Sequence, residues 1–348
     1  MTTRRDRTRA RARLSAEVRR FLAGLGYEEV ETPSLVPAPG MEPHLHPFEA
    51  RFVPEGGGAA RPLWLITSPE YAMKRLLAEG FPRVFQLSRV FRNGEVSATH
   101  NPEFTMLELY RAGTDHRGVM ADVEQLVETC ARAFAFPAGS ERAARPGPGG
   151  VSPDLSAPFQ VLSCAEAFLR HAGVDLAACI GADGRGDGER LRAAAGAAGH
   201  DAGPGGEPFE DVFFRIMLTA VEPKLGVDRP TWLTDWPASM AALARLRPDD
   251  PRWAERFELY AGGLELANGF HELNDAAEQR RRLVAEQEER RRLGRPALPL
   301  DEQFLTAVGR MPEAGGVAIG FDRLLMLLTG AATIQEVLLF PASGFWEG

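Results

Sequence analysis

Long apolar runs are absent from this 348-residue chain. No apolar segment approaches the roughly 20 residues that a helix needs to cross a bilayer. The N-terminal stretch MTTRRDRTRARARL also lacks the apolar core of a secretion signal. These two absences argue against a membrane-spanning protein and against an exported one. We therefore expect a soluble protein of the cytoplasm with no membrane partner.

Cysteine is scarce as well. The chain has three cysteines, Cys130, Cys164 and Cys179. They show no CxxC pairing and no nearby histidine at the spacing that zinc sites use. Neither a disulfide framework nor a zinc site of this kind is expected, and a reducing compartment fits best.

An excess of positive charge is also missing. The net charge of −8 excludes a globally basic nucleic-acid binder. Arginine does gather at the start of the chain, but no aromatic side chains that would stack on bases are interleaved with it. We therefore interpret this start as a solvated helix or tail. Its arginines are at positions 4, 5, 7, 9, 11 and 13.

The length allows one large α/β or α+β domain, or two ordinary ones. Two stretches rich in glycine and proline interrupt it. Residues 140–154 are expected to form a surface connection, and residues 181–208 a variable insertion with one short helix and no core of its own. Residues 275–294 predict an exposed helix with many ion pairs.

The most informative stretch is VFQLSRVFRNGEVSATHNPEFTMLELYRAG, residues 84–113, which predicts two strands joined by a polar loop. Period-two alternation puts Phe104, Met106, Glu108 and Tyr110 on one face of the second strand. An aromatic plate, a carboxylate and a phenol then share one surface. Such a surface suits a nucleotide base and a cationic group.

This segment resembles motif 2 of the class II aminoacyl-tRNA synthetases, and HNPEFTMLELY is similar to the lysyl-tRNA synthetase version. The resemblance implies that Arg92 steadies the α-phosphate of ATP and that Phe104 stacks on adenine. The family has FRNE where this chain has FRNGE. Either Glu95 takes the place of the usual glutamate through a loop shift, or adenine recognition depends on the backbone and Phe104. Further ATP contacts implied in this loop are Asn93, Gly94, Glu95, His100 and Asn101.

Residues 9–33 combine a helix and a strand. Apolar residues recur at helical spacing from Arg9 to Gly24, and the strand that follows is broken by Pro33. A plain amphipathic helix gives the same pattern. Because this helix and strand come before residues 84–113 in the chain, they resemble class II motif 1. Motif 1 builds the dimer interface in that family, so the resemblance implies a homodimer.

Three acids recur at intervals of seven in RFELYAGGLELANGFHELND: Glu258, Glu265 and Glu272. If Ala261 and Gly262 form a two-residue hairpin loop, Glu258 and Glu265 lie directly opposite each other, and these like charges need a cation between them. Mg²⁺ bound with ATP would supply it. The alternative is a register that separates the two acids.

A regular strand would put Glu272 on the other face from Glu265, because seven is odd. We expect Asn268-Gly269 to supply a bulge that returns it. ELANGFHELND resembles the lysyl-tRNA synthetase segment whose last glutamate holds the ammonium of lysine. By this resemblance Glu258 and Glu265 bind the metal and Glu272 binds the amine of the substrate. It also implies contacts of Leu266 with ATP and of Asn268 with the substrate.

The stretch GGVAIGFDRLLMLLTG, residues 315–330, predicts a glycine-rich strand that runs into a helix beginning near Asp322. Arg323 in the first turn joins the helix N-terminal amides in facing phosphate. The stretch resembles motif 3, whose arginine holds the γ-phosphate, and the resemblance implies that Gly320 also contacts ATP.

Upstream, Ser68, Pro69 and Glu70 precede a helix in WLITSPEYAMKRLL. By themselves they indicate only a helix N-terminus with an acid in its first turn. They resemble the synthetase segment that recognises the amine of the amino acid. The same resemblance adds three residues to the substrate pocket, namely Glu108, Tyr110 and Ala318.

The three motifs imply one class II catalytic domain over residues 1–348, with an α+β fold in which an antiparallel sheet is flanked by helices. The implied reaction is adenylation. The carboxylate of a lysine-like substrate attacks the α-phosphate of ATP in line, and a second nucleophile takes the acyl group. ATP and Mg²⁺ are the implied cofactors.

Within this class, SPEYAMKRLL, VFQLSRVFRN and GGLELANGFHEL resemble the elongation factor P (R)-β-lysine ligases. Ala318 fits them, because lysyl-tRNA synthetases have glycine there. The chain also reaches motif 1 at once, which leads us to expect no anticodon-reading contact with tRNA. The implied activity is transfer of (R)-β-lysine or lysine to the ε-amine of a lysine on elongation factor P.

Two other classes of function stay open. A tRNA-charging enzyme or a free-standing amino-acid ligase would share every catalytic residue, and only the acceptor separates them. A non-catalytic regulatory module would have lost motif residues, whereas Arg92, Glu258, Glu265 and Arg323 are all present.

Overall fold

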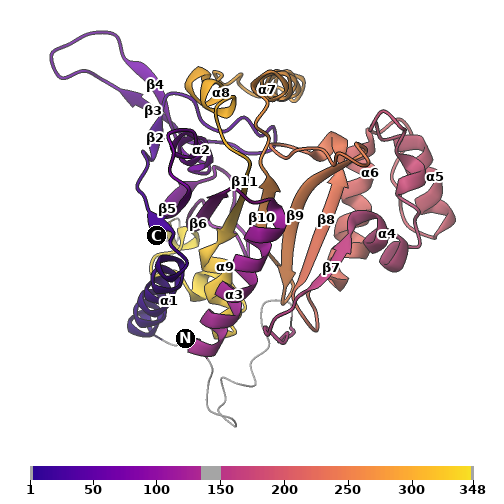
Figure 1. Cartoon of the computed structure of the whole chain (residues 1–348), viewed down its shortest axis with the longest axis horizontal. Helices are drawn as coiled ribbons and strands as arrows, with labels where there is room; N and C mark the ends of the chain where they lie inside the picture. Colours follow the sequence, from indigo (N-terminus) through magenta and orange to yellow (C-terminus); the bar gives the residue numbers. More distant parts are fainter. Residues whose placement is uncertain (1–2, 135–149, 346–348) are drawn as a thin grey trace. The chain divides into compact units, whose positions relative to one another are not determined.

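The computed structural model describes residues 3–134 and 150–345 (Figure 1). Most of the connection expected at 140–154 therefore lies outside the described residues. The chain divides into two compact units. The expectation of a single domain over residues 1–348 stays a prediction. Unit 1 comprises Met1–Asp115, Leu273–Met326 and Thr333–Gly348, and unit 2 comprises His116–Glu272 and Leu327–Ala332.

The main sheet of unit 1 has the strand order β1-β5-β6-β11. Its strands are β1 (Glu28–Glu29), β5 (Arg83–Phe91), β6 (Glu103–Ala112) and β11 (Ala314–Gly320). β1 runs parallel to β5, and the other pairs are antiparallel. β5 and β6 confirm the two strands predicted within 84–113, where β-branched and aromatic residues favour extended backbone.

A second, three-stranded sheet of unit 1 has the order β2-β4-β3, and both of its pairs are antiparallel. β3 and β4 form the hairpin that extends at the upper left of Figure 1. The strands are β2 (Leu35–Val36), β3 (Glu49–Phe52) and β4 (Arg61–Leu65).

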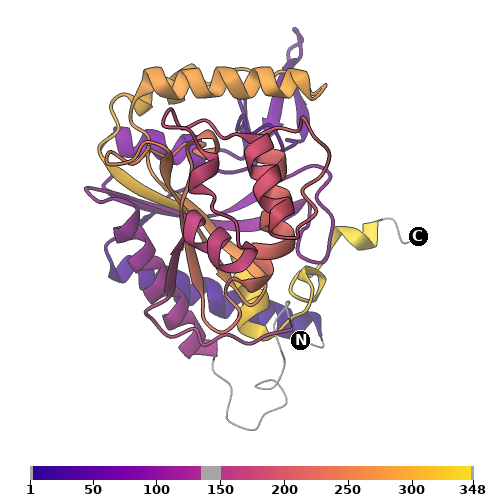
Figure 2. The same ribbon diagram turned by 90° about the vertical axis from the view of Figure 1, so that its right-hand side faces the viewer.

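Unit 1 also holds α1 (Arg4–Gly24), α2 (Glu70–Ala78), α7 (Ala276–Arg292) and α8 (Glu302–Val308). Figure 2 shows α7 side-on along its full length. Asp275 caps α7, because its side chain accepts hydrogen bonds from the first-turn amides. The predicted helix over 275–294 is therefore confirmed. The core that links α2 to the main sheet consists of Met73, Leu77, Val84, Tyr110, Met311 and Ala314.

α1 begins at Arg4, ahead of the predicted start at Arg9, because the side chain of Thr3 caps it. The expectation of a wholly solvated arginine-rich start is wrong for two arginines. Arg7 donates a hydrogen bond to the Leu338 carbonyl over 2.9 Å. Arg11 pairs with Asp322 at the start of α9 (Phe321–Thr329). Both partners lie far along the sequence, so local charge patterning did not reveal them.

The sheet of unit 2 has the strand order β10-β9-β8-β7. β7 runs parallel to β8, and the other two pairs are antiparallel. Its strands are β7 (Gln160–Ser163), β8 (Thr231–Pro237), β9 (Trp253–Ala261) and β10 (Leu264–His271).

In unit 2, α4 (Cys164–Ala172), α5 (Gly188–Ala197) and α6 (Phe209–Ile216) lie together beside β7 and β8 (Figure 1). α5 is the one helix expected within 181–208, so that part of the prediction is confirmed. The segment also adds Leu191, Ala195 and Ala202 to a core shared with α4 and α6. α3 (His116–Phe134) packs on β9 and β10.

Short helical turns complete the described chain. They are η1 (Ala177–Cys179), η2 (Met217–Val221), η3 (Glu222–Lys224), η4 (Ala238–Met240), η5 (Ile334–Glu336) and η6 (Ala342–Phe345).

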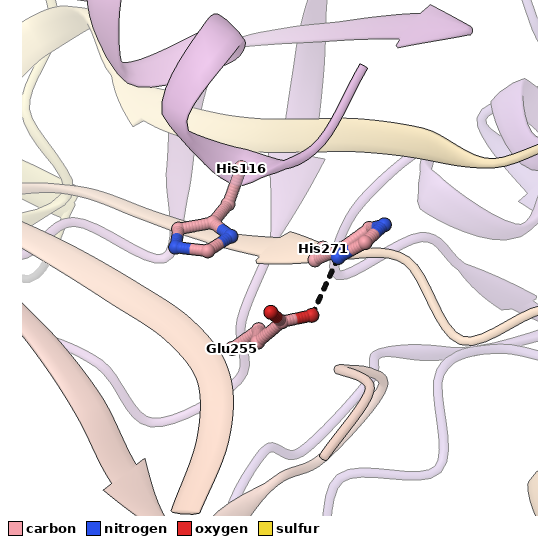
Figure 3. Close-up of side chains that lie close together, drawn as sticks. All are labelled: His116, Glu255 and His271. Carbon is pink, nitrogen blue, oxygen red and sulfur yellow. Dashed lines mark hydrogen bonds and ion pairs between the residues drawn. The ribbon is translucent and has the colours of Figure 1, made fainter. Parts of the chain in front are cut away.

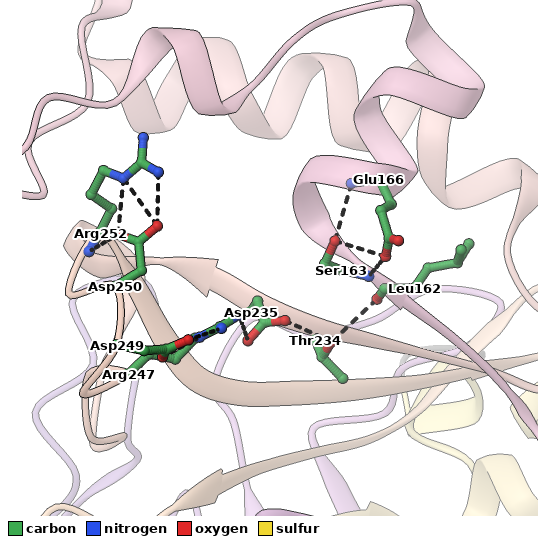
Figure 4. Close-up of polar contacts among 9 residues, drawn as sticks. All are labelled: Leu162, Ser163, Glu166, Thr234, Asp235, Arg247, Asp249, Asp250 and Arg252. Carbon is green, nitrogen blue, oxygen red and sulfur yellow. Dashed lines mark hydrogen bonds and ion pairs between the residues drawn. The ribbon is translucent and has the colours of Figure 1, made fainter.

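The register of β8 against β9 shifts beside Asp235, which has a left-handed φ of 53° (Figure 4). Arg247 holds this residue through an ion pair of 3.2 Å and also contacts Asp249 at 2.5 Å. Thr234 donates to the Leu162 carbonyl over 3.5 Å and so connects β8 to β7. A non-glycine residue at positive φ costs free energy, and these contacts offset it.

No helix among the described residues is both long and apolar enough to span a membrane. All three cysteines are buried thiols.

Candidate active site

In unit 1 the site is built on the face shared by β5, β6 and β11. Glu108 on β6 lies opposite Gln86 on β5 and Ala318 on β11. The Tyr110 hydroxyl donates to Glu108 over 3.0 Å, which shows that these two side chains share one face. Ser68 donates to the other oxygen of Glu108 over 2.6 Å. Ser68, Glu108 and Tyr110 thus form one polar cluster, in which Glu108 and Tyr110 are buried and Ser68 is half-buried.

The pKa of Glu108 is raised to about 8, first by burial and then by the negative charge of Glu70. The hydrogen bonds from Ser68 and Tyr110 oppose this shift only in part. A carboxyl group in such surroundings is stabilised as an anion by a nearby positive charge. The cluster therefore suits a ligand with an ammonium group.

Ser68, Pro69 and Glu70 lie at the N-terminus of α2, with Pro69 at the N-cap position. The backbone N–H of Glu70 donates to the Ser68 hydroxyl over 3.0 Å, so Ser68 links this turn to Glu108. Glu70 forms an ion pair of 2.6 Å with Lys74, which is 1% exposed. Sequence reasoning missed Lys74, although its spacing of four residues from Glu70 on a helix was a usable signal.

A cavity of about 420 Å³ opens at this turn. Its volume is that of a small-molecule site. Ser68, Pro69 and Glu70 line it together with Glu42, Ile66 and residues 299–303.

The loop between β5 and β6 contains a tight turn at the departure from the family pattern. Gly94 has a φ of +87°, and the N–H of Glu95 points back to the Arg92 carbonyl at 3.5 Å. The Glu95 carboxylate then lies 4.0 Å from the Arg92 guanidinium. The added glycine is accommodated in the turn, and the role of Glu95 in place of the usual glutamate stays a prediction. Asn93 is held by its N–H, which donates to the His46 carbonyl over 2.7 Å.

Two arginines lie along this loop. The guanidinium of Arg92 lies 5.2 Å from the ring centroid of Phe104. A positive charge therefore lies next to the ring that is predicted to stack on adenine. Arg323, in the first turn of α9, is 2.7 Å from Nε2 of His100. Nδ1 of His100 in turn contacts the Ser97 hydroxyl at 2.8 Å. A cationic group therefore stands at each end of the loop.

Asp322 fixes the start of α9 and with it the backbone of Arg323. It accepts the N–H of Thr105 on β6 over 2.7 Å and also pairs with Arg11. Gly320 lies opposite Met106 in the ladder. A Cβ atom added at Gly320 would lie 3.4 Å from the nearest atom of the Arg323 side chain. A side chain at position 320 would therefore be in van der Waals contact with Arg323.

Asn101 has a structural role in the described chain. Its amide nitrogen donates to the Glu103 carbonyl over 2.6 Å, and its oxygen accepts the N–H of Ala342 over 2.9 Å. A contact of the Asn101 side chain with ATP would have to replace one of these two hydrogen bonds.

In unit 2 the acids lie on the β9–β10 hairpin, whose loop is Gly262-Gly263. The prediction of Ala261-Gly262 is wrong by one residue. Both glycines have positive φ, +61° and +76°, and a two-residue hairpin loop of this kind needs that conformation twice. As a result Glu265 lies opposite Tyr260, and Glu258 lies opposite Asn268.

The bulge in β10 falls at Leu266, between Glu265 and Ala267, rather than at Asn268-Gly269. It returns Asn268 to the same face as Glu265. Because Tyr260 and Glu258 are two residues apart, Glu258 is on this face as well. The two acids are therefore diagonal neighbours instead of a directly opposed pair.

Glu258 is buried, and burial raises its pKa to about 7. The charge of Arg256 lowers the pKa, whereas the charge of Glu265 raises it. Its oxygens accept hydrogen bonds from Arg256 over 2.6 Å and from Tyr260 over 2.5 Å. Sequence reasoning missed both partners, although each is two residues from Glu258 and hence on its face.

Glu272 follows β10 and is completely buried. Its backbone pairs with Ala244, and its carbonyl accepts a hydrogen bond of 3.0 Å from Arg245. Alternation from Asn268 puts its side chain on the face of the other acids. Unit 2 thus gathers Glu258, Glu265, Asn268 and Glu272, as unit 1 gathers the Ser68 cluster and the two arginines.

A comparison with protein families agrees with these elements. The model of the family described as tRNA synthetases class II (D, K and N) matches residues 2–344. This match spans α1 and β1, the β5–β6 hairpin and the β11–α9 unit, which are the elements predicted to be motifs 1, 2 and 3. The chain belongs to the class II tRNA synthetases of the D, K and N family and carries their α+β catalytic domain.

Proposed function

We propose that this protein is an ATP-dependent, AMP-forming ligase that activates (R)-β-lysine or lysine and transfers it to a lysine ε-amine of elongation factor P. The observation that carries the proposal is the Ser68–Glu108–Tyr110 cluster beside Glu70, in which Glu108 and Tyr110 are buried. The ammonium group of an amino acid would supply the positive charge that stabilises the Glu108 carboxylate, and the completely buried Glu272 would pair with a second amine, which an apolar amino acid lacks.

ATP is assigned to the residues of the β5–β6 loop and α9. Arg92 and Arg323 bring positive charge to phosphate oxygens, and Phe104 offers a stacking surface to adenine. Other residues are assigned to the ATP site through the family resemblance. They are Asn93, Gly94, Glu95, His100, Leu266 and Gly320. Adenylation then proceeds by positioning and charge stabilisation, with the substrate carboxylate in line with the α-phosphate.

The acids of unit 2 fit Mg²⁺. Glu258 and Glu265 share a face, and the side-chain oxygen of Asn268 on that face is buried without a hydrogen-bond partner among the described residues. Hard oxygen donors of this kind are what Mg²⁺ prefers. Bound Mg²⁺ neutralises phosphate charge. Each oxygen of Glu258 that accepts a hydrogen bond keeps a second lone pair for a cation.

For the amino acid, Glu70 is assigned the backbone amine and Glu272 the distal ammonium. Ala318, which lies opposite Glu108, adds a methyl group where lysyl-tRNA synthetases have glycine. A methyl group at this position alters the space open to the amine. One methyl contributes about 1 kcal/mol of discrimination.

The acceptor rests on the resemblance of SPEYAMKRLL, VFQLSRVFRN and GGLELANGFHEL to the elongation factor P ligases. A lysine–tRNA ligase or a free-standing amino-acid ligase is the alternative, because these enzymes need the same activation residues. We also propose that the enzyme is a homodimer formed through residues 9–33, which light scattering of the purified chain would test.

The deciding experiment measures the intact mass of elongation factor P after incubation with the enzyme, ATP, Mg²⁺ and either (R)-β-lysine or α-lysine. Host tRNA serves as a parallel acceptor. We expect addition of one lysyl group to the protein, faster with the β isomer. Charged tRNA with unmodified elongation factor P would overturn the acceptor and leave the activation chemistry intact. No adenylation of either amino acid would overturn the whole proposal. Arg323→Gln is the inactive control.

A further inference from the structure

Unit 2 holds a second group of metal-ligating side chains, which the proposed reaction does not use. His116, Glu255 and His271 each present one ligand atom, and these atoms all lie within 4.8 Å of one another. Figure 3 shows the three side chains pointing toward one another from three elements. His116 is the first residue of α3, Glu255 lies on β9, and His271 ends β10.

The β-ladder explains why Glu255 and His271 meet. The last pair of the β9–β10 ladder is Phe270 with Arg256, so the next positions along the two strands are His271 and Glu255. There Arg245 enters between the strands. Its N–H donates to the His271 carbonyl over 2.9 Å, and its carbonyl accepts the N–H of Glu255 over 2.8 Å. One residue therefore fixes the backbone of both ligands.

The third ligand is held by ring packing. The imidazole of His116 stacks on Phe257 with a centroid distance of 6.1 Å, and it lies 6.2 Å from the ring of His271. Phe257 and Glu258 are adjacent on a strand and so point to opposite faces. The cluster thus lies on the face covered by α3, away from the acids assigned to Mg²⁺.

Burial and access suit a bound ion. His116 is 5% exposed and His271 is 6% exposed, so two imidazoles are withdrawn from water. The side chain of Glu255 is 17% exposed, which leaves a path for an ion to enter. Nδ1 of His271 lies 2.5 Å from a Glu255 oxygen. A metal ion that replaces the shared proton widens this contact to about 3 Å, given metal–ligand bonds of about 2.0–2.2 Å.

We propose that His116, Glu255 and His271 bind a divalent transition metal of the zinc class, which fixes the start of α3 to the open end of the β9–β10 hairpin. Two imidazoles and one carboxylate are ligands that Zn²⁺ and its neighbours take, whereas Mg²⁺ prefers oxygen alone. Three protein ligands leave the fourth position to water. Because Glu272 follows His271 directly, the ion also fixes the backbone of that acid.

The first test uses the full chain with no histidine tag, freed of metal by a chelator and dialysed against Co²⁺ and Zn²⁺ with excess Mg²⁺ present. We expect one equivalent of Co²⁺ per chain with visible absorption bands of a four- or five-coordinate site, displaced by Zn²⁺. We also expect Zn²⁺ to raise the melting temperature. Less than one equivalent, or an octahedral Co²⁺ spectrum alone, would overturn the site.

Variants assign the ligands. His116→Gln and Glu255→Gln should each weaken Zn²⁺ binding by at least about tenfold. His171→Gln, which removes a histidine of the same unit outside the cluster, should leave binding unchanged. Circular dichroism checks folding, and the wild-type Co²⁺ spectrum decides the matter if a variant fails to fold. Equal Zn²⁺ affinity of the wild type and both ligand variants would contradict the proposal.

Discussion

At the scale of single residues, the structure explains why the candidate site tolerates so many acids. Glu70 has a buried lysine as its partner, and Glu258 has an arginine and a tyrosine. Glu108 has two hydroxyl donors, and its pKa is raised to about 8, whereas that of Glu258 is raised to about 7. Hydroxyl groups stabilise a buried carboxylate less than a charged partner does.

This difference predicts how stability depends on pH. The folded state raises the pKa of Glu108 from 4.5 to about 8, so between these values the folded protein binds the proton more tightly than the unfolded chain does. The contribution of Glu108 to stability is therefore full below pH 4.5 and is lost as the pH rises toward 8. The loss amounts to roughly 3–5 kcal/mol.

Glu108→Gln, which cannot ionise, should remove most of this fall in the free energy of unfolding, measured by urea denaturation from pH 4.5 to pH 9. Glu103→Gln changes an exposed carboxylate on the same strand and should keep the wild-type slope. Equal slopes for the wild type and Glu108→Gln would show that another group governs the pH dependence.

At the scale of elements, one loop decides where the acids of unit 2 lie. The Gly262-Gly263 turn sets the register of the β9–β10 hairpin, and the bulge at Leu266 then brings Glu265 and Asn268 to one face. A slip of one residue would move the side chains of a strand to its other face. The glycines of the loop therefore affect the site without contacting a ligand.

Gly263→Ala should lower the free energy of unfolding by about 1 kcal/mol, because its φ of +76° is unfavourable for a residue with a Cβ. Gly263→Asn should cost less, since asparagine tolerates this conformation. Gly196→Ala is the matched control. It lies within α5 with open space around it and should stabilise the protein by about 0.5–1 kcal/mol. Thermal unfolding of the three variants checks this order.

At the scale of the whole molecule, the family match covers residues 2–344 and so includes residues of both units. The arginines assigned to the phosphates of ATP are in unit 1, and the acids assigned to Mg²⁺ are in unit 2. The proposed activity therefore needs residues from both.

Removal of Mg²⁺ tests this requirement. With excess EDTA, lysine-dependent exchange of pyrophosphate into ATP should fall at least about a hundredfold, because phosphate charge is no longer neutralised. Added Mg²⁺ should restore the exchange. Glu265→Gln should reproduce the loss at ordinary Mg²⁺, whereas Glu313→Gln, an acid of unit 1 outside the assigned site, should retain activity. Exchange that persists in EDTA would contradict the assignment of the acids to a metal.

The sequence alone determined the strands of 84–113, the helix at 276–292 and the family, because alternation, helical periodicity and motif order are local properties of the chain. Only the tertiary structure decided the hairpin register at Gly262-Gly263, the contacts of Arg7 and Arg11, and the convergence of His116 with Glu255 and His271. These features depend on pairs of residues far apart in sequence, or on whether Ala261 or Gly262 begins the turn, and periodicity along the sequence decides neither.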